Sequence, residues 1–312
     1  KKKGITSLII DLQSNGGGLM DAAINIVDEF LPKNKEILYT KGTHYPRQSF
    51  YSKSNSSFDG NVVVLIDEYS ASASEIVSGA LQDWDRAIVV GRRSFGKGLV
   101  QRPLSLADGS ELRLTIARYY TPSGRNIQKP YSDGVEKYQN ELVGRKKHGE
   151  LQNADSINFP DSLKFKTLVL GRTVYGGGGI MPDVFVPLDT TKFTVFHREI
   201  LAKGILNQSV MDITEKKGKE IKKLFPKFEQ YESGFLVSDD IFDSIVADAK
   251  KANIKIDNQQ IETSKPIITL QIKALLARTF YEQGDYYKIM NKENNIVMKG
   301  VEVIKNFDKY LK

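Results

Sequence analysis

The chain has 312 residues, of which 40% are hydrophobic and 27% are charged, as in an ordinary globular protein. Its net charge is +7, but lysine and arginine alternate with acidic residues along most of the chain, which indicates a solvated surface rather than a nucleic-acid-binding one. No apolar run approaches the ~20 residues that a membrane-spanning helix needs. The lack of cysteine excludes disulfides and cysteine metal sites, and it is compatible with an oxidising compartment.

The first predicted elements are a strand, a glycine loop and a helix. Residues 7–12 read S-L-I-I-D-L and predict a buried strand, and apolar residues at helical spacing predict a helix over 19–31. Between them lies Gly16-Gly17-Gly18. Such a loop could cradle a phosphate, but it lacks the P-loop lysine and the G-x-G-x-x-G order, so a permissive turn is the simpler interpretation. A short strand over 36–39 and a polar loop or hairpin over 43–60 follow.

The chain is organised around residues 62–101. Residues 62–66 are an unbroken, β-branched apolar run, typical of a buried strand. Apolar residues at helical spacing then predict a helix beginning near Ser72, and residues 87–90 predict a second buried strand. A lysine flanked by glycines, Gly96-Lys97-Gly98, comes next. A serine at a helix N-terminus and a lysine in a glycine loop are the components of a Ser/Lys nucleophile pair.

The chemistry of such a pair is simple. A serine hydroxyl is a weak nucleophile at neutral pH and needs a base, and the three histidines, His44, His148 and His197, lie outside this segment. A lysine can serve as the base if it is desolvated, because burial favours its neutral form. Glycines around Lys97 would allow close packing there. The helix N-terminus after Ser72 would offer backbone N–H groups to an oxyanion.

Each motif also has a plainer interpretation. Ser72-x-x-Glu75 is a capping box, in which the serine only caps the helix, and Gly96-Lys97-Gly98 is compatible with a turn carrying a solvated lysine. Residues 91–97 match the first seven positions of a phosphate-binding P-loop. That match fails at Gly98, where Ser or Thr should bind Mg²⁺, and residues 99–103 predict a strand where a helix should start.

Taken together, the motifs S-A-S-A-S-E-I at 70–76 and F-G-K-G-x-x-Q at 95–101 resemble the carboxyl-terminal processing, or tail-specific, serine peptidases. The spacing from Ser72 to Lys97 agrees with that family as well. The resemblance implies that Ser72 is the nucleophile, Lys97 the general base and Gln101 the hydrogen-bond partner of the lysine.

The same resemblance implies an oxyanion hole. The segment D-L-x-x-N-x-G-G at 11–18 would supply one backbone N–H, from Gly17 or Gly18, and Ala73 would supply the second. Asp83 matches a further acidic position of the family. Its alternative interpretation is a solvated carboxylate near the helix end.

The second half of the peptidase region contains a hairpin and an insertion. Residues 99–106 and 112–119 flank Asp108-Gly109, a strong hairpin signal, and the alternation of Leu112, Leu114 and Ile116 predicts one buried face. The segment T-P-S-G-R-N-I-Q at 121–128 again resembles the family, in which it leads directly into G-I-x-P-D. Here that match comes only at 179–183, so we expect 129–175 to be a surface insertion.

From residue 190 onward the pattern becomes helical, with apolar helical spacing over 193–206, 241–252, 267–281 and 295–311. We therefore expect a peptidase domain over 1–189, with a crotonase- or ClpP-like α/β core by resemblance, and a helical accessory domain over 190–312. The chain starts Lys1-Lys2-Lys3-Gly4, without a methionine or a signal peptide, so we expect a fragment or a processed form. We therefore expect the N-terminal segment and PDZ domain of the resembled family to lie outside this chain.

The sequence thus predicts a serine endopeptidase that cuts protein substrates with exposed C-termini by acyl transfer, without metal or cofactor. By resemblance, its location would be the periplasm or cell envelope. Two other classes stay open: a catalytically silent peptide-binding scaffold of the same fold, and a P-loop nucleotide hydrolase. A peptidase needs both Ser72 and Lys97, a scaffold tolerates the loss of either, and nucleotide binding needs Lys97 alone.

Overall fold

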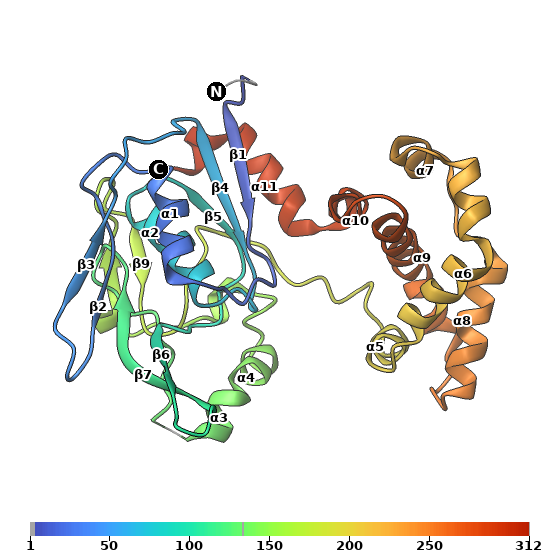
Figure 1. Cartoon of the computed structure of the whole chain (residues 1–312), viewed down its shortest axis with the longest axis horizontal. Helices are drawn as coiled ribbons and strands as arrows, with labels where there is room; N and C mark the ends of the chain where they lie inside the picture. The colour runs from blue at the N-terminus through green and yellow to red at the C-terminus, as the bar shows by residue number, and fades with distance from the viewer. Residues whose placement is uncertain (1–3, 133, 312) are drawn as a thin grey trace. The chain divides into compact units, whose positions relative to one another are not determined.

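The computed structural model describes residues 4–132 and 134–311, which form two compact units (Figure 1). One unit contains the chain up to Pro187 together with the residues from Lys299 onward, and the other contains Leu188–Met298. The C-terminal residues thus return to the first unit. This differs from the single helical domain that we expected over 190–312, because helical spacing alone does not reveal which core a helix packs on.

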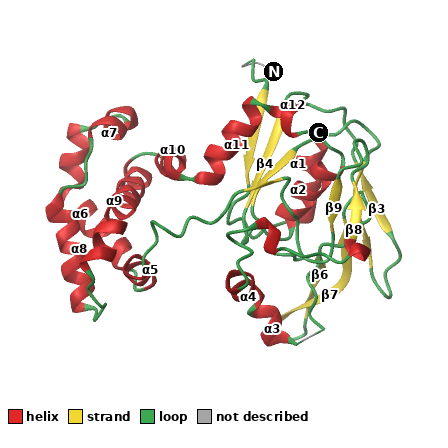
Figure 2. Cartoon of the chain, turned by 180° about the vertical axis from the view of Figure 1, so that it is seen from behind, coloured by secondary structure: helices red, strands yellow, loops and turns green. Residues whose placement is uncertain are grey.

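The first unit is built on two four-stranded sheets (Figure 2). The parallel sheet has the order β1 (Ser7–Asp11), β4 (Asn61–Ile66), β5 (Ile88–Gly91), β10 (Val184–Phe185). The antiparallel sheet has the order β3 (Gln48–Tyr51), β2 (Glu36–Lys41), β7 (Glu111–Tyr120), β6 (Leu99–Ser105). A separate pair is formed by β8 (Lys164–Lys166) and β9 (Thr173–Tyr175). The helices of this unit are α1 (Met20–Asp28), α2 (Ala73–Asp83), α3 (Val135–Gln139), α4 (Glu141–Lys147) and α12 (Phe307–Tyr310), with most of α11 (Asn295–Lys305) and 3₁₀ turns at Ala154–Ser156 and Asp161–Leu163.

Strand β4 is central because it is covered on both faces. Val62, Val64 and Ile66 pack into the core that α1 and α2 share with the strand. Leu65 points to the other face and packs against Gly300 of α11. A Cβ added to Gly300 would lie only 2.7 Å from Cδ2 of Leu65. Since both faces are buried, every position of β4 after Asn61 is apolar.

The second unit is helical and has its own core. It contains α5 (Val195–Ala202), α6 (Ile205–Leu224), α7 (Phe228–Gly234), α8 (Asp239–Lys251), α9 (Asn258–Phe280) and α10 (Gln283–Met290), with a 3₁₀ turn at Asn291–Glu293. The helix predicted over 193–206 is two helices, because Gly204 adopts φ 71° between them. The helix predicted from 267 begins nine residues earlier and contains Pro266, and the Asp257 side chain caps its start. The apolar spacing from 267 onward therefore missed the first turns of this helix, which include the proline.

The hairpin β6–β7 is present, but the buried face that we predicted for it is wrong. Leu112 and Leu114 are each 48% exposed. The pairing of β7 with β2 involves only Arg118, Tyr119 and Tyr120, so the distal part of the hairpin extends past the sheet. Alternating apolar residues indicate a possible buried face, but burial also needs an element that covers this face.

Among the described residues, no helix combines the length and apolar character needed to cross a lipid bilayer.

Two leucines that look equivalent in the sequence are expected to differ in their contribution to stability. Leu65 is fully buried and Leu114 is half exposed. Leu65→Ala should lower the free energy of unfolding by about 2–5 kcal/mol, because it removes buried methyl groups and leaves a cavity. Leu114→Ala should lower it by less than about 1 kcal/mol. Urea unfolding of both variants tests this, and an equal loss would show that the hairpin face is covered.

Candidate active site

Five of the predicted site residues line one cleft of about 430 Å³ in the first unit: Gly18, Ser72, Ala73, Lys97 and Gln101. Four segments position them. Gly18 lies in the loop between β1 and α1, and Lys97 lies in the loop between β5 and β6. Ser72 and Ala73 begin α2, which follows β4 after a short loop, and Gln101 is on β6, after a bulge. Residues far apart in the sequence therefore surround the same space.

Ser72 has a strained backbone. Its φ of 56° and ψ of −117° lie in a region that residues with side chains rarely adopt. Such strain persists only where the surroundings hold the residue. The Ser72 N–H donates to Glu75 Oε2 at 2.8 Å, and its carbonyl oxygen lies 3.0 Å from the Tyr119 hydroxyl. The helix start is thus held through both backbone groups of the serine.

Glu75 connects the serine to the lysine. Its side chain is fully buried, and Oε2 accepts the backbone N–H groups of Ser72 and Lys97, both at 2.8 Å. Oε1 accepts the Gly96 N–H at 2.7 Å and the Ser94 hydroxyl. Burial raises the pKa of the Glu75 carboxyl above its ordinary value, and these hydrogen bonds oppose the rise. The carboxylate is the acidic member of the predicted capping box, but the sequence does not reveal its partners in the lysine loop.

Tyr119 makes a second connection. Its hydroxyl lies 2.6 Å from the carbonyl oxygen of Lys97 and 3.0 Å from that of Ser72. Burial raises the pKa of Tyr119 well above its ordinary value, so the hydroxyl remains a donor at every physiological pH. This residue was missed in the sequence, where it reads as one apolar position of a strand.

Glycines allow the lysine loop to pack closely. Gly96 adopts φ 88°, and a Cβ on it would lie 3.0 Å from the Gly179 backbone nitrogen. A Cβ on Gly98 would lie 3.0 Å from the Gln128 nitrogen. The G-I-x-P-D segment therefore packs against Gly96, and the T-P-S-G-R-N-I-Q segment packs against Gly98. The two segments flank the lysine loop, although the insertion separates them in the sequence.

The two candidate oxyanion glycines have different surroundings. Gly17 adopts φ 90°, and a Cβ there would lie 2.7 Å from the Ala73 nitrogen and 2.9 Å from the Ser72 Cβ. Its own N–H already donates to Asn15 Oδ1 at 2.9 Å. Gly18 is the glycine of the two that lines the cleft. Gly17 therefore shapes the backbone behind the serine, and Gly18 faces the space in front of it.

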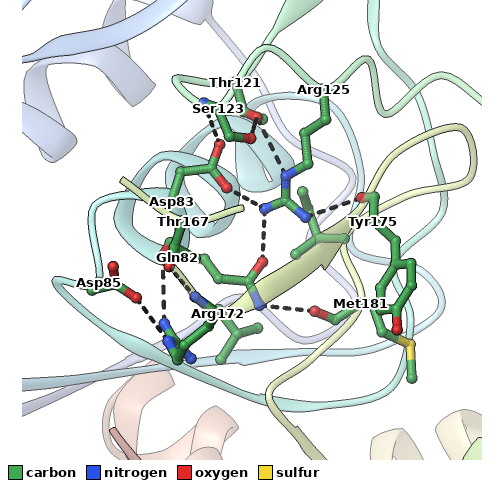
Figure 3. Close-up of polar contacts among 12 residues, drawn as sticks. Gln82, Asp83, Asp85, Thr121, Ser123, Arg125, Thr167, Arg172, Tyr175 and Met181 are labelled. Atoms are coloured by element: carbon green, nitrogen blue, oxygen red, sulfur yellow. Dashed lines mark hydrogen bonds and ion pairs between the residues drawn. The ribbon is translucent and has the colours of Figure 1, made fainter. Parts of the chain in front are cut away.

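Asp83 does not line the cleft, and its interpretation as a solvated carboxylate is wrong. The residue is fully buried in a polar network (Figure 3), where it forms an ion pair of 2.7 Å with Arg125 and accepts the Ser123 N–H at 2.9 Å. Neighbouring Asp85 pairs with Arg172 at 2.7 Å. The network joins the C-terminal end of α2 to residues 121–125 and 167–175. Asp83 thus holds together the segments behind the cleft.

The P-loop interpretation is also wrong. The loop of residues 91–97 leads into strand β6, so no helix N-terminus follows it. Glu75 accepts the N–H groups of Gly96 and Lys97, which a phosphate-binding loop would direct at the ligand. In the part of the chain that the structure describes, no group of three or more His, Asp or Glu side chains could hold a metal ion.

Comparison with known proteins finds a family match for each part of the chain. Residues 1–137 match the model of peptidase family S41. Over these residues the chain is similar to the carboxyl-terminal processing peptidases of that family. The resemblance seen in the two motifs is thereby confirmed. Residues 196–282 match a family of unknown function, DUF8443, and lie within the second unit.

The S41 segment is similar to several processing proteases. The carboxyl-terminal-processing protease of Synechocystis is 41% identical over 129 residues, covering 41% of this chain and 30% of the relative. That of Bartonella bacilliformis is 49% identical over 122 residues, covering 38% and 28%. Among solved structures, a photosystem II D1 C-terminal processing protease is 37% identical with a TM-score of 0.38, covering 41% of this chain and 33% of that one. The chain spans less than a third of the length of these two relatives.

Alanine substitution should separate the two glycines. Gly17→Ala places a Cβ 2.6 Å from the Ala71 carbonyl oxygen at a positive φ, so the free energy of unfolding should fall by about 1–3 kcal/mol. Gly18→Ala meets no heavy atom within 4 Å and should be nearly neutral. Urea unfolding measures both, and equal stabilities would contradict the packing of Gly17 against Ser72.

Removing one partner of the buried Asp83–Arg125 ion pair should strongly destabilise the protein. Arg125→Ala leaves a buried carboxylate without its counter-charge, so the free energy of unfolding should fall by about 3–5 kcal/mol. Arg113→Ala is the control, because the Arg113–Glu111 pair is largely exposed and its loss should change little. Equal effects in urea unfolding would show that the Asp83 site is hydrated.

Proposed function

We propose that the complete protein is a serine endopeptidase in which Ser72 and Lys97 form the catalytic dyad. One observation carries the proposal. The serine that begins α2 and the lysine of the glycine loop line the same cleft, and one buried carboxylate binds the backbone N–H groups of both. The match of residues 1–137 to peptidase family S41 supports the same activity.

In the proposed reaction, neutral Lys97 takes the proton of the Ser72 hydroxyl as Oγ bonds to the peptide carbonyl carbon. The lysine then gives this proton to the leaving amine, and the C–N bond breaks. Water, activated by the same lysine, hydrolyses the acyl-enzyme. Gln101, on the same cleft wall, would orient the lysine amine without adding a charge that holds its proton.

The oxyanion would lie between Gly18 and Ala73. Ala73 is the first residue of α2, so its N–H points out of the helix start and adds to the helix dipole. Gly18 lines the cleft beside it, whereas the N–H of Gly17 is bound to Asn15. The backbone of Gly17 supports the site, and the N–H of Gly18 is the stronger candidate for the second donor.

The substrate would be a protein chain cut near its C-terminus, as the names of the relatives suggest. Several apolar residues of the cleft, including Leu19, Ile76 and Leu99, would accept an apolar side chain of the substrate.

The parallel sheet with α1 and α2 against the antiparallel sheet supports a crotonase- or ClpP-like description of the core, and the second unit would be a helical accessory domain. A periplasmic or cell-envelope location is part of this proposal, because it rests on family resemblance. A peptide-binding scaffold is less favoured, because binding alone does not require a strained serine in the same cleft as a lysine.

Labelling with a serine-directed fluorophosphonate, together with cleavage of an unstructured protein, tests the proposal. The complete native protein should be labelled, and Ser72→Ala should not be. Lys97→Arg retains the charge but does not release its proton near neutral pH, so labelling should slow by about 10²–10⁴-fold.

Ser78→Ala is the matched control, because Ser78 is a buried serine of the same helix whose hydroxyl donates to the Ser74 carbonyl. It should be labelled at the native rate. Rapid labelling of Lys97→Arg would overturn the dyad, and labelling of Ser72→Ala would assign the nucleophile to another residue.

A further inference from the structure

The loop that carries Lys97 is bound by the insertion on one side. The carbonyl oxygens of residues 93–96 accept hydrogen bonds from residues of the 129–175 segment. Arg145 Nη1 donates to Ser94 at 2.7 Å and to Arg93 at 3.3 Å, and Nη2 donates to Phe95 at 3.2 Å. The Gly96 carbonyl accepts the backbone N–H of Lys129 at 3.0 Å. Four consecutive carbonyls before Lys97 are therefore held by the insertion.

The N–H groups of the same loop are bound on the other side, by the peptidase core. Phe95 N–H donates to the Ser70 carbonyl at 2.9 Å, and those of Gly96 and Lys97 donate to Glu75. Ser70 and Glu75 belong to the segment that carries Ser72. The loop is thus fixed between the nucleophile's segment and the insertion.

Arg145 is well suited to this contact. Its side chain is 2% exposed, and Nε forms an ion pair of 2.6 Å with Glu141. A buried guanidinium needs its donors satisfied, and its planar fork can reach several carbonyls at once. Here three carbonyls of one loop and one carboxylate accept from it. A lysine at this position would have a single nitrogen and could not reproduce the pattern.

The insertion also holds a side chain of the loop. The Lys129 ammonium lies 3.8 Å from the ring centre of Phe95 and 4.3 Å from that of Tyr138 in α3, and it donates to the Tyr138 carbonyl at 3.1 Å. These contacts fix Phe95, two residues before Lys97. Since Gly96 adds no side-chain constraint of its own, external contacts must define the backbone that directs the lysine.

We infer that Arg145 is a positioning residue for Lys97, and that the 129–175 insertion braces the catalytic loop from outside the core. The inference rests on the proposed function of Lys97. Without Arg145 the carbonyls of residues 93–95 would turn to water and the loop would gain alternative conformations. A displacement of ~1 Å at a catalytic group can slow a reaction by about 10²-fold. Arg145 touches neither substrate nor reacting atoms in this scheme, and acts only through the loop.

The test compares Arg145→Lys and Arg145→Ala with matched changes at Arg172. Arg172 is an arginine of the same insertion whose side chain is 12% exposed, but its partners are Asp85, Asp183 and Gln82, away from the lysine loop. The measurements are fluorophosphonate labelling rates, together with kcat and KM, for the complete protein below the unfolding temperature of every variant. Both Arg145 variants should be labelled about 10²-fold more slowly, with a lower kcat and an unchanged KM.

The Arg172 variants should lose stability while keeping the native labelling rate, kcat and KM. A merely structural role for Arg145 would produce the Arg172 pattern, and that result would overturn the inference.

The outcomes separate this inference from the proposed function. Absence of labelling in the native protein would reject the proposed function itself. Normal labelling of the native protein and of folded Arg145→Lys would overturn only the inference. Should neither Arg145 variant fold, Glu141→Gln removes the charge that orients the guanidinium and should slow labelling several-fold. A native rate in that variant would likewise overturn the role of Arg145.

Discussion

The site depends on one buried carboxylate. Glu75 receives two hydrogen bonds from the lysine loop through backbone N–H groups, one from the Ser94 hydroxyl and one from the Ser72 N–H. A carboxylate without partners would be costly at this depth, so the N–H groups and the acceptor stabilise one another. Because one buried group binds both segments, the spacing between the serine and the lysine backbones does not rely on the glycine loop alone.

Tyr119 and Gly17 also hold the backbones of the serine and the lysine in place. Tyr119 bridges the carbonyls of Ser72 and Lys97, so each of the two residues has its N–H bound by Glu75 and its carbonyl close to one phenol. The Gly17 backbone packs behind the serine, where any side chain would collide with Ala71 or Ala73. These contacts offset the backbone strain of Ser72, which is tolerable only in a well-packed environment.

The rest of the first unit supplies a firm base for these contacts. Strand β4 leads through a short loop to the serine and is buried on both faces, by the α1–α2 core and by α11. The Asp83–Arg125 network secures the other end of α2, so that helix is fixed at both termini. The insertion, expected to be only a surface excursion, contributes cations to the loop and to this network. A polar composition therefore did not mean a peripheral role, because most of these polar atoms bind backbone carbonyls or buried carboxylates.

The sequence by itself determined the features that depend on neighbours along the chain. The apolar run of β4, the helical spacing of α2, the Asp108-Gly109 turn and the two motifs around Ser72 and Lys97 are local patterns, and each is visible without knowledge of the fold. Only the tertiary structure decided which groups meet across long separations. It assigned Glu75 to the lysine loop, paired Asp83 with Arg125, left Leu112 and Leu114 exposed and returned α11 to β4. The physical reason is that burial and hydrogen-bond partners belong to the surrounding space, and a one-dimensional pattern records only which residues could be buried or paired.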